Sequence, residues 1–266
     1  MVANTVSFNG LLGRLSLARV TCVGDVMLDQ FLEGEVHRLS PEAPIPVIQV
    51  RSEKAMPGGA GNVVRNIAAL GAKARLISVI GDDHQGRRLK ELFASQHNLS
   101  VQLVVEERRP TTVKTRYIAA RQQLLRADRE VTSPINTVTK STITSSFEEE
   151  ILARDGVLVL SDYGKGVLKA DMISSLINIA KQNNTKVIID PKGKDFSVYR
   201  GADLITPNLN ELAKASGMPT NSDDEVITAA RQIIQTAGID AVLATRSEQG
   251  MSIITVSYTH LTLPTT

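Results

Sequence analysis

Pro57-Gly58-Gly59-Ala60-Gly61-Asn62 opens directly into a helical pattern that runs from Ala60 to Leu70. A β-branched run from Arg75 to Ile80 follows the helix, and two aspartates follow the run. Glycines let a ligand approach the backbone, and the first amides of a helix are free to bind oxygen atoms. An ordinary tight turn fits the same glycines, so this segment alone leaves both interpretations open.

The same alternation of helix and strand patterns extends over most of the chain. Further β-branched runs lie at residues 19–23, 157–160, 186–189, 202–205, 241–244 and 251–256, and further helical patterns lie at residues 171–182, 209–216 and 223–237. Alternation of this kind indicates βαβ units. We therefore predict an α/β fold whose central sheet is mostly parallel.

Two segments interrupt this rhythm. Residues 30–50 contain three prolines, and residues 101–130 include a strand-like alternation from Val113 to Ile118. We expect both segments to be extended structure outside the main sheet, forming a small β lid over the ligand cleft. Residues 257–266 continue neither pattern, and we expect a foreign or truncated terminus there. The predicted organisation is one domain over residues 1–256 with the lid as an excursion.

Composition excludes several classes of protein. The 266 residues carry a formal net charge of +2, with both signs mixed along the chain, so we expect no nucleic-acid partner. A single cysteine, Cys22, lies in an apolar run, which rules out an intrachain disulfide and indicates a buried thiol. With neither a signal peptide nor a long apolar run, we expect a cytoplasmic protein with no membrane partner.

A polar residue comes directly after each of several predicted strands: Asp25, Asp162, Asp190, Asn208 and Thr245. Ligands of open α/β sheets bind beyond the carboxyl ends of the strands, so these residues are expected to ring one cleft. The sequence has no Gly-x-x-x-x-Gly-Lys-Ser/Thr loop and no Gly-x-Gly-x-x-Gly run. A P-loop enzyme and a dinucleotide dehydrogenase are therefore not indicated.

Carboxylates and a lysine near the first and second of these strand ends suit a sugar phosphate. Asp25 and Asp29 are acceptors for sugar hydroxyls, although a turn cap at Asp25 and a solvated Asp29 explain them more simply. Lys165, in a glycine-flanked turn, suits a phosphate as a point charge or is a solvated loop residue. Arg126, with Lys114 or Arg116, suits an anionic group, but arginines on exposed strands are more often solubilising.

The later strand ends suit a nucleotide. Asn208 and Glu211 form a capping-box pattern, which is a structural explanation. A helix start at the cleft equally suits nucleotide phosphates and Mg²⁺, with Glu211 holding the metal through water. Residues 245–250 fit a simple hairpin, and a nucleotide can line the same turn.

Six segments taken together, in this order, resemble the ribokinase-like (PfkB) carbohydrate kinases. They are Gly24-Asp25-Val26-Met27-Leu28-Asp29, Pro57-Gly58-Gly59-Ala60-Gly61-Asn62, Ser161-Asp162-Tyr163-Gly164-Lys165-Gly166, Asp190-Pro191-Lys192-Gly193, Thr206-Pro207-Asn208-Leu209-Asn210-Glu211 and Ser247-Glu248-Gln249-Gly250-Met251. Within that family they resemble the branch that phosphorylates D-glycero-β-D-manno-heptose 7-phosphate. The resemblance covers residues 15–256 and implies a three-layer αβα sandwich with a small β lid.

The resemblance also implies an activity and a set of ligand contacts. The activity is transfer of the ATP γ-phosphate to the anomeric hydroxyl of the heptose, with Mg²⁺, on the route to the ADP-heptose of the lipopolysaccharide core. Asp25, Asp29, Gly58, Gly59 and Asn62 would hold the sugar. The residues implied for the nucleotide and its Mg²⁺ are Asn208, Glu211, Thr245, Ser247 and Gly250. A homodimer joined through the lids is a further expectation.

The catalytic base of this family belongs to a Gly-Ala-Gly-Asp motif, which does not occur in these 266 residues. We expect the base to lie beyond Val256 in the natural protein, and we assign no catalytic residue within this chain. Two alternatives stay open: another sugar or sugar-phosphate kinase of the same family, and a non-catalytic module that binds a sugar phosphate or a nucleotide.

Overall fold

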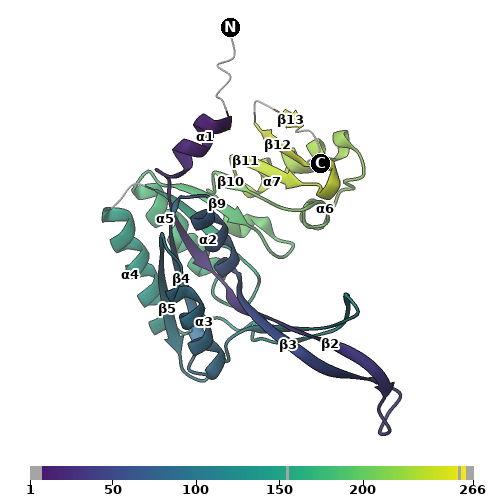
Figure 1. Ribbon diagram of the computed structural model, residues 1–266. Helices are drawn as coiled ribbons and strands as arrows, with labels where there is room; N and C mark the ends of the chain where they lie inside the picture. Colours follow the sequence, from purple (N-terminus) through teal and green to yellow (C-terminus); the bar gives the residue numbers. More distant parts are fainter. Residues whose placement is uncertain (1–7, 154–155, 257–258, 262–266) are drawn as a thin grey trace.

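A parallel sheet forms the centre of the computed structural model, which describes residues 8–153, 156–256 and 259–261 (Figure 1). In this part of the chain the sheet has the order β13-β12-β11-β10-β9-β8-β1-β4-β5. Its strands are β1 (Arg19–Gly24), β4 (Lys73–Gly81), β5 (Leu99–Glu106), β8 (Val157–Ser161), β9 (Lys186–Asp190), β10 (Leu204–Ile205), β11 (Ala241–Thr245), β12 (Met251–Thr255) and β13 (Thr259–Leu261). Only β11-β12 and β12-β13 pair antiparallel, so the prediction of a mostly parallel sheet is confirmed.

Helices cover both faces of the sheet because neighbouring strand residues point to opposite sides. Cys22 of β1 packs in a core with residues of α2 (Ala60–Ala69) and α3 (His84–Ala94). Its neighbour Val23 packs in a second core with α4 (Thr137–Ala153), α5 (Ala170–Gln182) and α7 (Asp223–Ala237). The remaining helical segments are α1 (Phe8–Leu15), η1 (Phe196–Tyr199), α6 (Leu209–Ser216) and η2 (Ser247–Gln249). The result is the expected three-layer αβα sandwich.

Cys22 is fully buried, as the sequence predicts, and burial with the nearby Asp190 charge raises the pKa of its thiol to about 12. It is therefore a small apolar core residue and not a reactive thiol. None of the described helices is both long and apolar enough to cross a membrane.

A second, four-stranded sheet stands beside the first, in the order β3-β2-β6-β7. Its strands are β2 (Val26–Leu39), β3 (Pro46–Gly59), β6 (Val113–Ala119) and β7 (Gln122–Arg129), and we call it the small sheet. The β2-β3 hairpin projects from the body of the molecule (Figure 1). Asp25 alone separates β1 from β2, and α2 begins where β3 ends, so the small sheet rises from the carboxyl ends of the central strands.

The predicted limits of this excursion need correction. Residues 101–106 belong to β5, which pairs in parallel with β4 at the edge of the central sheet. An edge strand has one neighbour only, and its sequence alternates much like a strand of a separate sheet, so the pattern does not separate the two. The lid segment predicted at residues 30–50 is also longer than expected, because the β2-β3 hairpin spans residues 26–59.

Several elements were not predicted, among them α3, α4 and β13. α3 carries few apolar residues, and it begins where the Asp83 carboxylate accepts a hydrogen bond from Gly86 N at 2.8 Å. α4 is rich in serine and threonine but buries Ile143 and Phe147. Residues 259–261, in the tail excluded from the predicted fold, pair with β12 as β13. Residues 257–258 and 262–266 of that tail lie outside the described residues.

Candidate active site

A cavity of about 600 Å³ lies at the carboxyl ends of the central strands. Its lining comes from the start of α2, the ends of β8, β9 and β11, and the start of α6: Val63, Val159, Tyr163, Ile188, Asp190, Lys192, Thr206, Asn208, Glu211 and Thr245. The sequence placed Asn208, Glu211 and Thr245 together, and they share this cavity. Ser247 and Gly250 are not in its lining but form the turn that follows Thr245, where Arg246 N donates to Gly250 O at 2.9 Å.

Asn208 and Glu211 make both bonds of a capping box. Asn208 Oδ1 accepts from Glu211 N at 2.9 Å, and Glu211 Oε2 accepts from Asn208 N at 3.1 Å. The other carboxylate oxygen of Glu211 accepts from Lys192 Nζ at 3.2 Å. The structural explanation is therefore correct for α6, and it leaves the second oxygen of Glu211 directed at a cationic side chain of the cavity.

Asp190 gives the cavity its acidic character. Burial raises the pKa of Asp190 to about 6, the nearby negative charge of Glu211 adds to this effect, and Lys192 opposes it. Two carboxylates that repel one another suit a divalent cation, and Mg²⁺ commonly takes only one or two protein carboxylates when nucleotide phosphates complete its shell. No cluster of three or more metal-ligating residues occurs in the described ranges, so Asp190 and Glu211 fit a shared Mg²⁺ and not a metal cage built by the protein alone.

Asp25, directly after β1, has partners in the structure that differ from the predicted sugar hydroxyls. Its side chain is 1% exposed. Asp25 Oδ2 accepts from the backbone amides of Tyr163 at 3.0 Å and Lys165 at 2.9 Å, and Oδ1 accepts from Val167 N at 3.1 Å. The carboxylate thus holds the loop that follows β8.

Asp29 stands further along β2 and pairs with the small sheet. Its Oδ1 lies 2.6 Å from Arg116 Nη1, and the Arg116 guanidinium lies 5.1 Å from the centre of the Phe31 ring. Gly58 faces it on β3, where a Cβ would collide with the Asp29 carboxylate. Glycine at 58 therefore makes room for Asp29.

The remaining predicted sugar residues lie at the turn into α2. Gly59 has φ of 58°, a backbone conformation that favours glycine, and α2 begins at the next residue. Asn62 is exposed on the first turn of α2. The amides and the side chain at this helix start are next to Val63, which lines the cavity.

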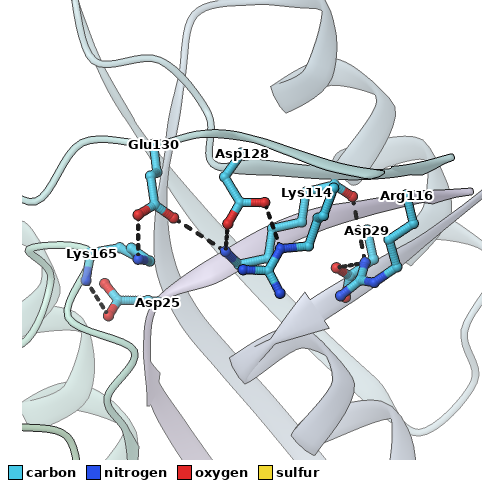
Figure 2. Close-up of polar contacts among 8 residues, drawn as sticks. Asp25, Asp29, Lys114, Arg116, Asp128, Glu130 and Lys165 are labelled. Atoms are coloured by element: carbon cyan, nitrogen blue, oxygen red, sulfur yellow. Dashed lines mark hydrogen bonds and ion pairs between the residues drawn. The ribbon is translucent and has the colours of Figure 1, made fainter. Parts of the chain in front are cut away.

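Figure 2 shows that the cations of the small sheet are joined to carboxylates. Lys114 Nζ lies 2.6 Å from Asp128 and 3.2 Å from Glu130. Arg126 Nε lies 2.9 Å from Asp128, and Lys165 Nζ lies 2.7 Å from Glu130. We call these five residues the ionic cluster. It joins Lys165 to Arg126 and Lys114, two of the residues expected to bind an anionic group, although Lys165 was expected to meet a phosphate separately; Asp128 and Glu130 are their partners in the structure.

Several residues of the site had no predicted role. Tyr163 and Lys192 line the cavity beside Asp190, which was expected at the cleft without a specific task, and each of the three stands in one of the six motifs, so the strand-end position was the available signal. Asp128 and Glu130 are the counter-charges of the ionic cluster. Apart from Arg126, which is two residues from Asp128, their partners lie 14 to 35 residues away in sequence, so no local pattern identifies the whole cluster.

Another cavity, of about 350 Å³, lies at the opposite ends of β1, β4 and β5. Its lining includes Arg19, Lys73, Arg75 and Glu150, and no residue of the six motifs reaches it. The cavity at the carboxyl ends of the strands, which we call the strand-end cavity, is therefore the candidate active site.

A mostly parallel sheet with polar loops, a glycine-opened helix and an acidic cavity at its carboxyl edge is typical of an α/β protein that binds its ligand beyond the strand ends. The family model described as "pfkB family carbohydrate kinase" matches residues 17–265, and the chain belongs to this family.

Relatives of known name support the same grouping. "Bifunctional protein HldE" of Rhodospirillum rubrum is 49% identical over 254 residues, which are 96% of this chain and 51% of that protein. "Bifunctional protein HldE" of Paramagnetospirillum magneticum is 49% identical over 88% of this chain and 48% of that protein. The chain spans about half the length of the curated relatives it matches.

Solved structures agree on the fold. Phosphofructokinase-2 from Escherichia coli in complex with substrates and products has a TM-score of 0.75 at 22% identity, covering 93% of this chain and 79% of that one. Ribokinase of Arabidopsis thaliana complexed with ribose and ATP has a TM-score of 0.70 at 16% identity, covering 92% and 78%. At these identities the likeness establishes the ribokinase-like fold.

Proposed function

We propose that this chain binds ATP and D-glycero-β-D-manno-heptose 7-phosphate, and that it belongs to an enzyme that phosphorylates the anomeric hydroxyl to give the 1,7-bisphosphate. The observation that carries the proposal is the strand-end cavity, which unites residues from three of the six motifs. The 49% identity to HldE proteins supports the heptose substrate over other sugars of the family.

The nucleotide end of the site comprises Asn208, Glu211, Thr245, Ser247 and Gly250. The Thr245 side of the cavity and the η2 turn would receive the nucleotide, and Mg²⁺ would be held by Glu211 through water, with Asp190 beside it. When bound, Mg²⁺ neutralises charge that develops on the transferred phosphate. Lys192, which now pairs with Glu211, is placed to approach the same phosphates.

The sugar end of the site comprises Asp29, Gly58, Gly59 and Asn62, with the ionic cluster beyond them. The carboxylate of Asp29 and the amide side chain of Asn62 accept or donate hydrogen bonds to hydroxyls. Arg126, Lys114 and Lys165 would hold the 7-phosphate in place of the carboxylates that now neutralise them.

With the nucleotide and the sugar phosphate bound at opposite ends of the site, the residues of this chain contribute to the reaction by positioning the two ligands and by stabilising charge. Phosphoryl transfer needs the hydroxyl and the γ-phosphate in line and the developing charge stabilised. We assign the role of base to no residue of these 266, because the Gly-Ala-Gly-Asp motif that carries it in the family does not occur in them.

Titration calorimetry on the 266-residue chain tests the proposal. Heptose 7-phosphate, fructose 6-phosphate, ribose and ATP are titrated separately, and ADP release is measured in the same samples by a coupled assay. We expect ATP and heptose 7-phosphate to bind, with fructose 6-phosphate at least about tenfold weaker. Tighter binding of fructose 6-phosphate would assign a different sugar kinase. Binding of both ligands without ADP release supports the non-catalytic module for this chain.

We also propose a homodimer that joins two small sheets. Apolar side chains are exposed on that sheet at Val36, Leu39, Val50, Leu124 and Leu125. Apolar surface gathered on one protruding sheet is typical of an interface. Light scattering over a concentration series measures the mass, and Leu125→Lys is expected to shift it to that of a monomer.

A further inference from the structure

The loop from Asp162 to Val167, which we call the β8 loop, stands between the two ends of the proposed site. Tyr163 lines the strand-end cavity, and Lys165 belongs to the ionic cluster. One short segment therefore supplies a residue to the nucleotide end and a residue to the sugar-phosphate end. Its backbone must be fixed for both residues to be in place.

Asp25 supplies the central support of this loop. Three amides of the loop, those of Tyr163, Lys165 and Val167, point at one carboxylate from 138 to 142 residues away in sequence. Both carboxylate oxygens are used and the residue is 1% exposed. A buried carboxylate that accepts several backbone amides is a charge-assisted arrangement, and each amide would otherwise be buried without a partner.

Independent contacts hold the loop from its other sides. Asp162 Oδ1 accepts from Gly164 N at 2.8 Å, and Asp162 Oδ2 accepts from the Tyr199 hydroxyl at 2.8 Å. The Tyr199 oxygen in turn accepts from Lys192 N at 2.9 Å, which joins the β8 loop to the loop after β9. Arg109 donates to Lys165 O, and also to Ser133 O at 3.0 Å.

Gly166 makes this packing possible. It has φ of 96°, and a Cβ there would collide with Ser133 O and the Arg109 guanidinium. Tyr163, Gly164 and Lys165 stay half-buried. Among the described residues, Asp25 is the one carboxylate outside the loop that accepts hydrogen bonds from the loop amides.

We propose that Asp25 is a positioning residue and not a ligand of the sugar: its carboxylate fixes the backbone of the β8 loop and thereby places Tyr163 at the nucleotide and Lys165 at the sugar phosphate. The inference rests on the proposed function for the identity of the two ligands. It assigns Asp25 and Asp29, which the sequence places in the same motif, to different tasks.

The two tasks predict different effects on binding. Asp25→Asn keeps the size of the side chain but turns one acceptor into a donor, which faces a loop amide. Because the loop serves both ends of the site, affinity for ATP and for heptose 7-phosphate should each fall by about tenfold or more. Asp29→Asn is the matched variant, since Asp29 contacts Arg116 and no loop amide, and it should weaken only the sugar phosphate.

Hydrogen exchange measures the protection of the amides of the β8 loop directly, independently of either ligand. In Asp25→Asn we expect the amides of Tyr163, Lys165 and Val167 to exchange about tenfold faster or more, and in Asp29→Asn we expect them unchanged. In the unsubstituted chain these amides should stay protected when heptose 7-phosphate saturates the site. That measurement remains informative if Asp25→Asn does not fold.

A selective loss of sugar-phosphate binding in Asp25→Asn, with the loop amides still protected, would overturn the proposal and return Asp25 to the sugar. Loss of protection in the unsubstituted chain when the sugar phosphate binds would overturn it too, because the carboxylate would then have left the loop. Failure of the proposed function looks different: neither ligand binds the unsubstituted chain, while the exchange contrast between the two variants persists.

Discussion

Lys165 Nζ lies 2.7 Å from Oε1 of Glu130, so a partly buried ion pair joins the loop after β8 to the end of β7. Glu130 also lies 3.2 Å from Lys114. The pKa of Glu130 is held below its ordinary value, chiefly by the hydrogen bond from Lys165 and also by Lys114, against the opposing effect of burial. Glu130 therefore stands between the two lysines that we propose as ligands of the 7-phosphate.

Replacement of this carboxylate should favour an anionic ligand. In Glu130→Gln the lysines lose a competing charge, and we expect affinity for heptose 7-phosphate to rise by about 0.5 to 1 kcal/mol, roughly two- to fivefold, while ATP affinity stays unchanged. Calorimetry measures both. Glu53→Gln is the matched control, because it breaks an ion pair with Arg88 away from the ionic cluster. Equal or lower sugar-phosphate affinity in Glu130→Gln would contradict the placement of the phosphate.

Asn62 is proposed to bind the sugar hydroxyls, away from the 7-phosphate, and its substitution tests that contact. Its side chain is exposed on the first turn of α2, so Asn62→Ala should cost the fold little. We expect sugar-phosphate affinity to fall by about 1 to 2 kcal/mol, because hydrogen bonds to hydroxyls are lost, and ATP affinity to change by less than about 0.5 kcal/mol. Titrations with each ligand decide. Equal losses for ATP and sugar would show that Asn62 is not at the sugar.

Much of this site was predictable from strand ends. Asp190, Asn208 and Thr245 follow β-branched runs, and a parallel sheet brings such ends to one edge whatever the exact boundaries of its strands. The six ordered motifs then identified the family. The strand-end residues and the motifs are both local in sequence, which is why the sequence alone could identify them.

The roles of individual side chains were less accessible. Whether Asp25 contacts a sugar or a loop depends on amides 138 to 142 residues away, and no pattern around Asp25 reports them. Strand 99–106 was misplaced for a related reason: its partner β4 is known only once the sheet is assembled. α4 was missed because serine and threonine are frequent along it and the apolar Val138 and Leu152 are exposed, which hides the helical spacing of Ile143 and Phe147.

Tyr199 should contribute to stability through its hydroxyl. Its ring is fully buried beside Phe196, and the hydroxyl bridges Asp162 and the Lys192 backbone. Burial and the adjacent Asp162 charge raise the pKa of Tyr199, so the hydroxyl stays protonated and able to donate. We expect Tyr199→Phe to lower the free energy of unfolding by about 1 to 3 kcal/mol, because two buried groups lose a partner.

Urea unfolding measures that loss. Tyr117→Phe is the control, since the Tyr117 hydroxyl has no hydrogen bond within the described ranges, and it should stay within about 0.5 kcal/mol of the unsubstituted chain. Similar stabilities for Tyr199→Phe and Tyr117→Phe would mean that the Asp162-Tyr199-Lys192 connection does not stabilise the fold.

Asp83 gives the fold a pH dependence with a defined sign. Its carboxylate accepts from Gly86 N at 2.8 Å, Thr111 N at 2.9 Å and Thr111 Oγ1 at 2.7 Å, which joins α3 to the segment before β6. Burial acts to raise the pKa of Asp83, but these hydrogen bonds outweigh it and lower the pKa. The contribution to stability is therefore complete above the pKa of the unfolded chain, near 3.9, and is lost as pH falls through the lower folded pKa.

Asp83→Asn removes this charge while keeping the shape of the cap. We expect the free energy of unfolding at pH 7 to fall by about 1 to 2 kcal/mol, and the difference from the unsubstituted chain to shrink as pH falls below about 3.9 and Asp83 is protonated. Urea unfolding at several pH values measures both. Asp82→Asn is the neighbouring control, because Asp82 is exposed and only 3.6 Å from exposed Arg87, an ion pair that contributes little. A difference between Asp83→Asn and the unsubstituted chain that stays constant with pH would mean that the charge of Asp83 is not what the Thr111 and Gly86 hydrogen bonds stabilise.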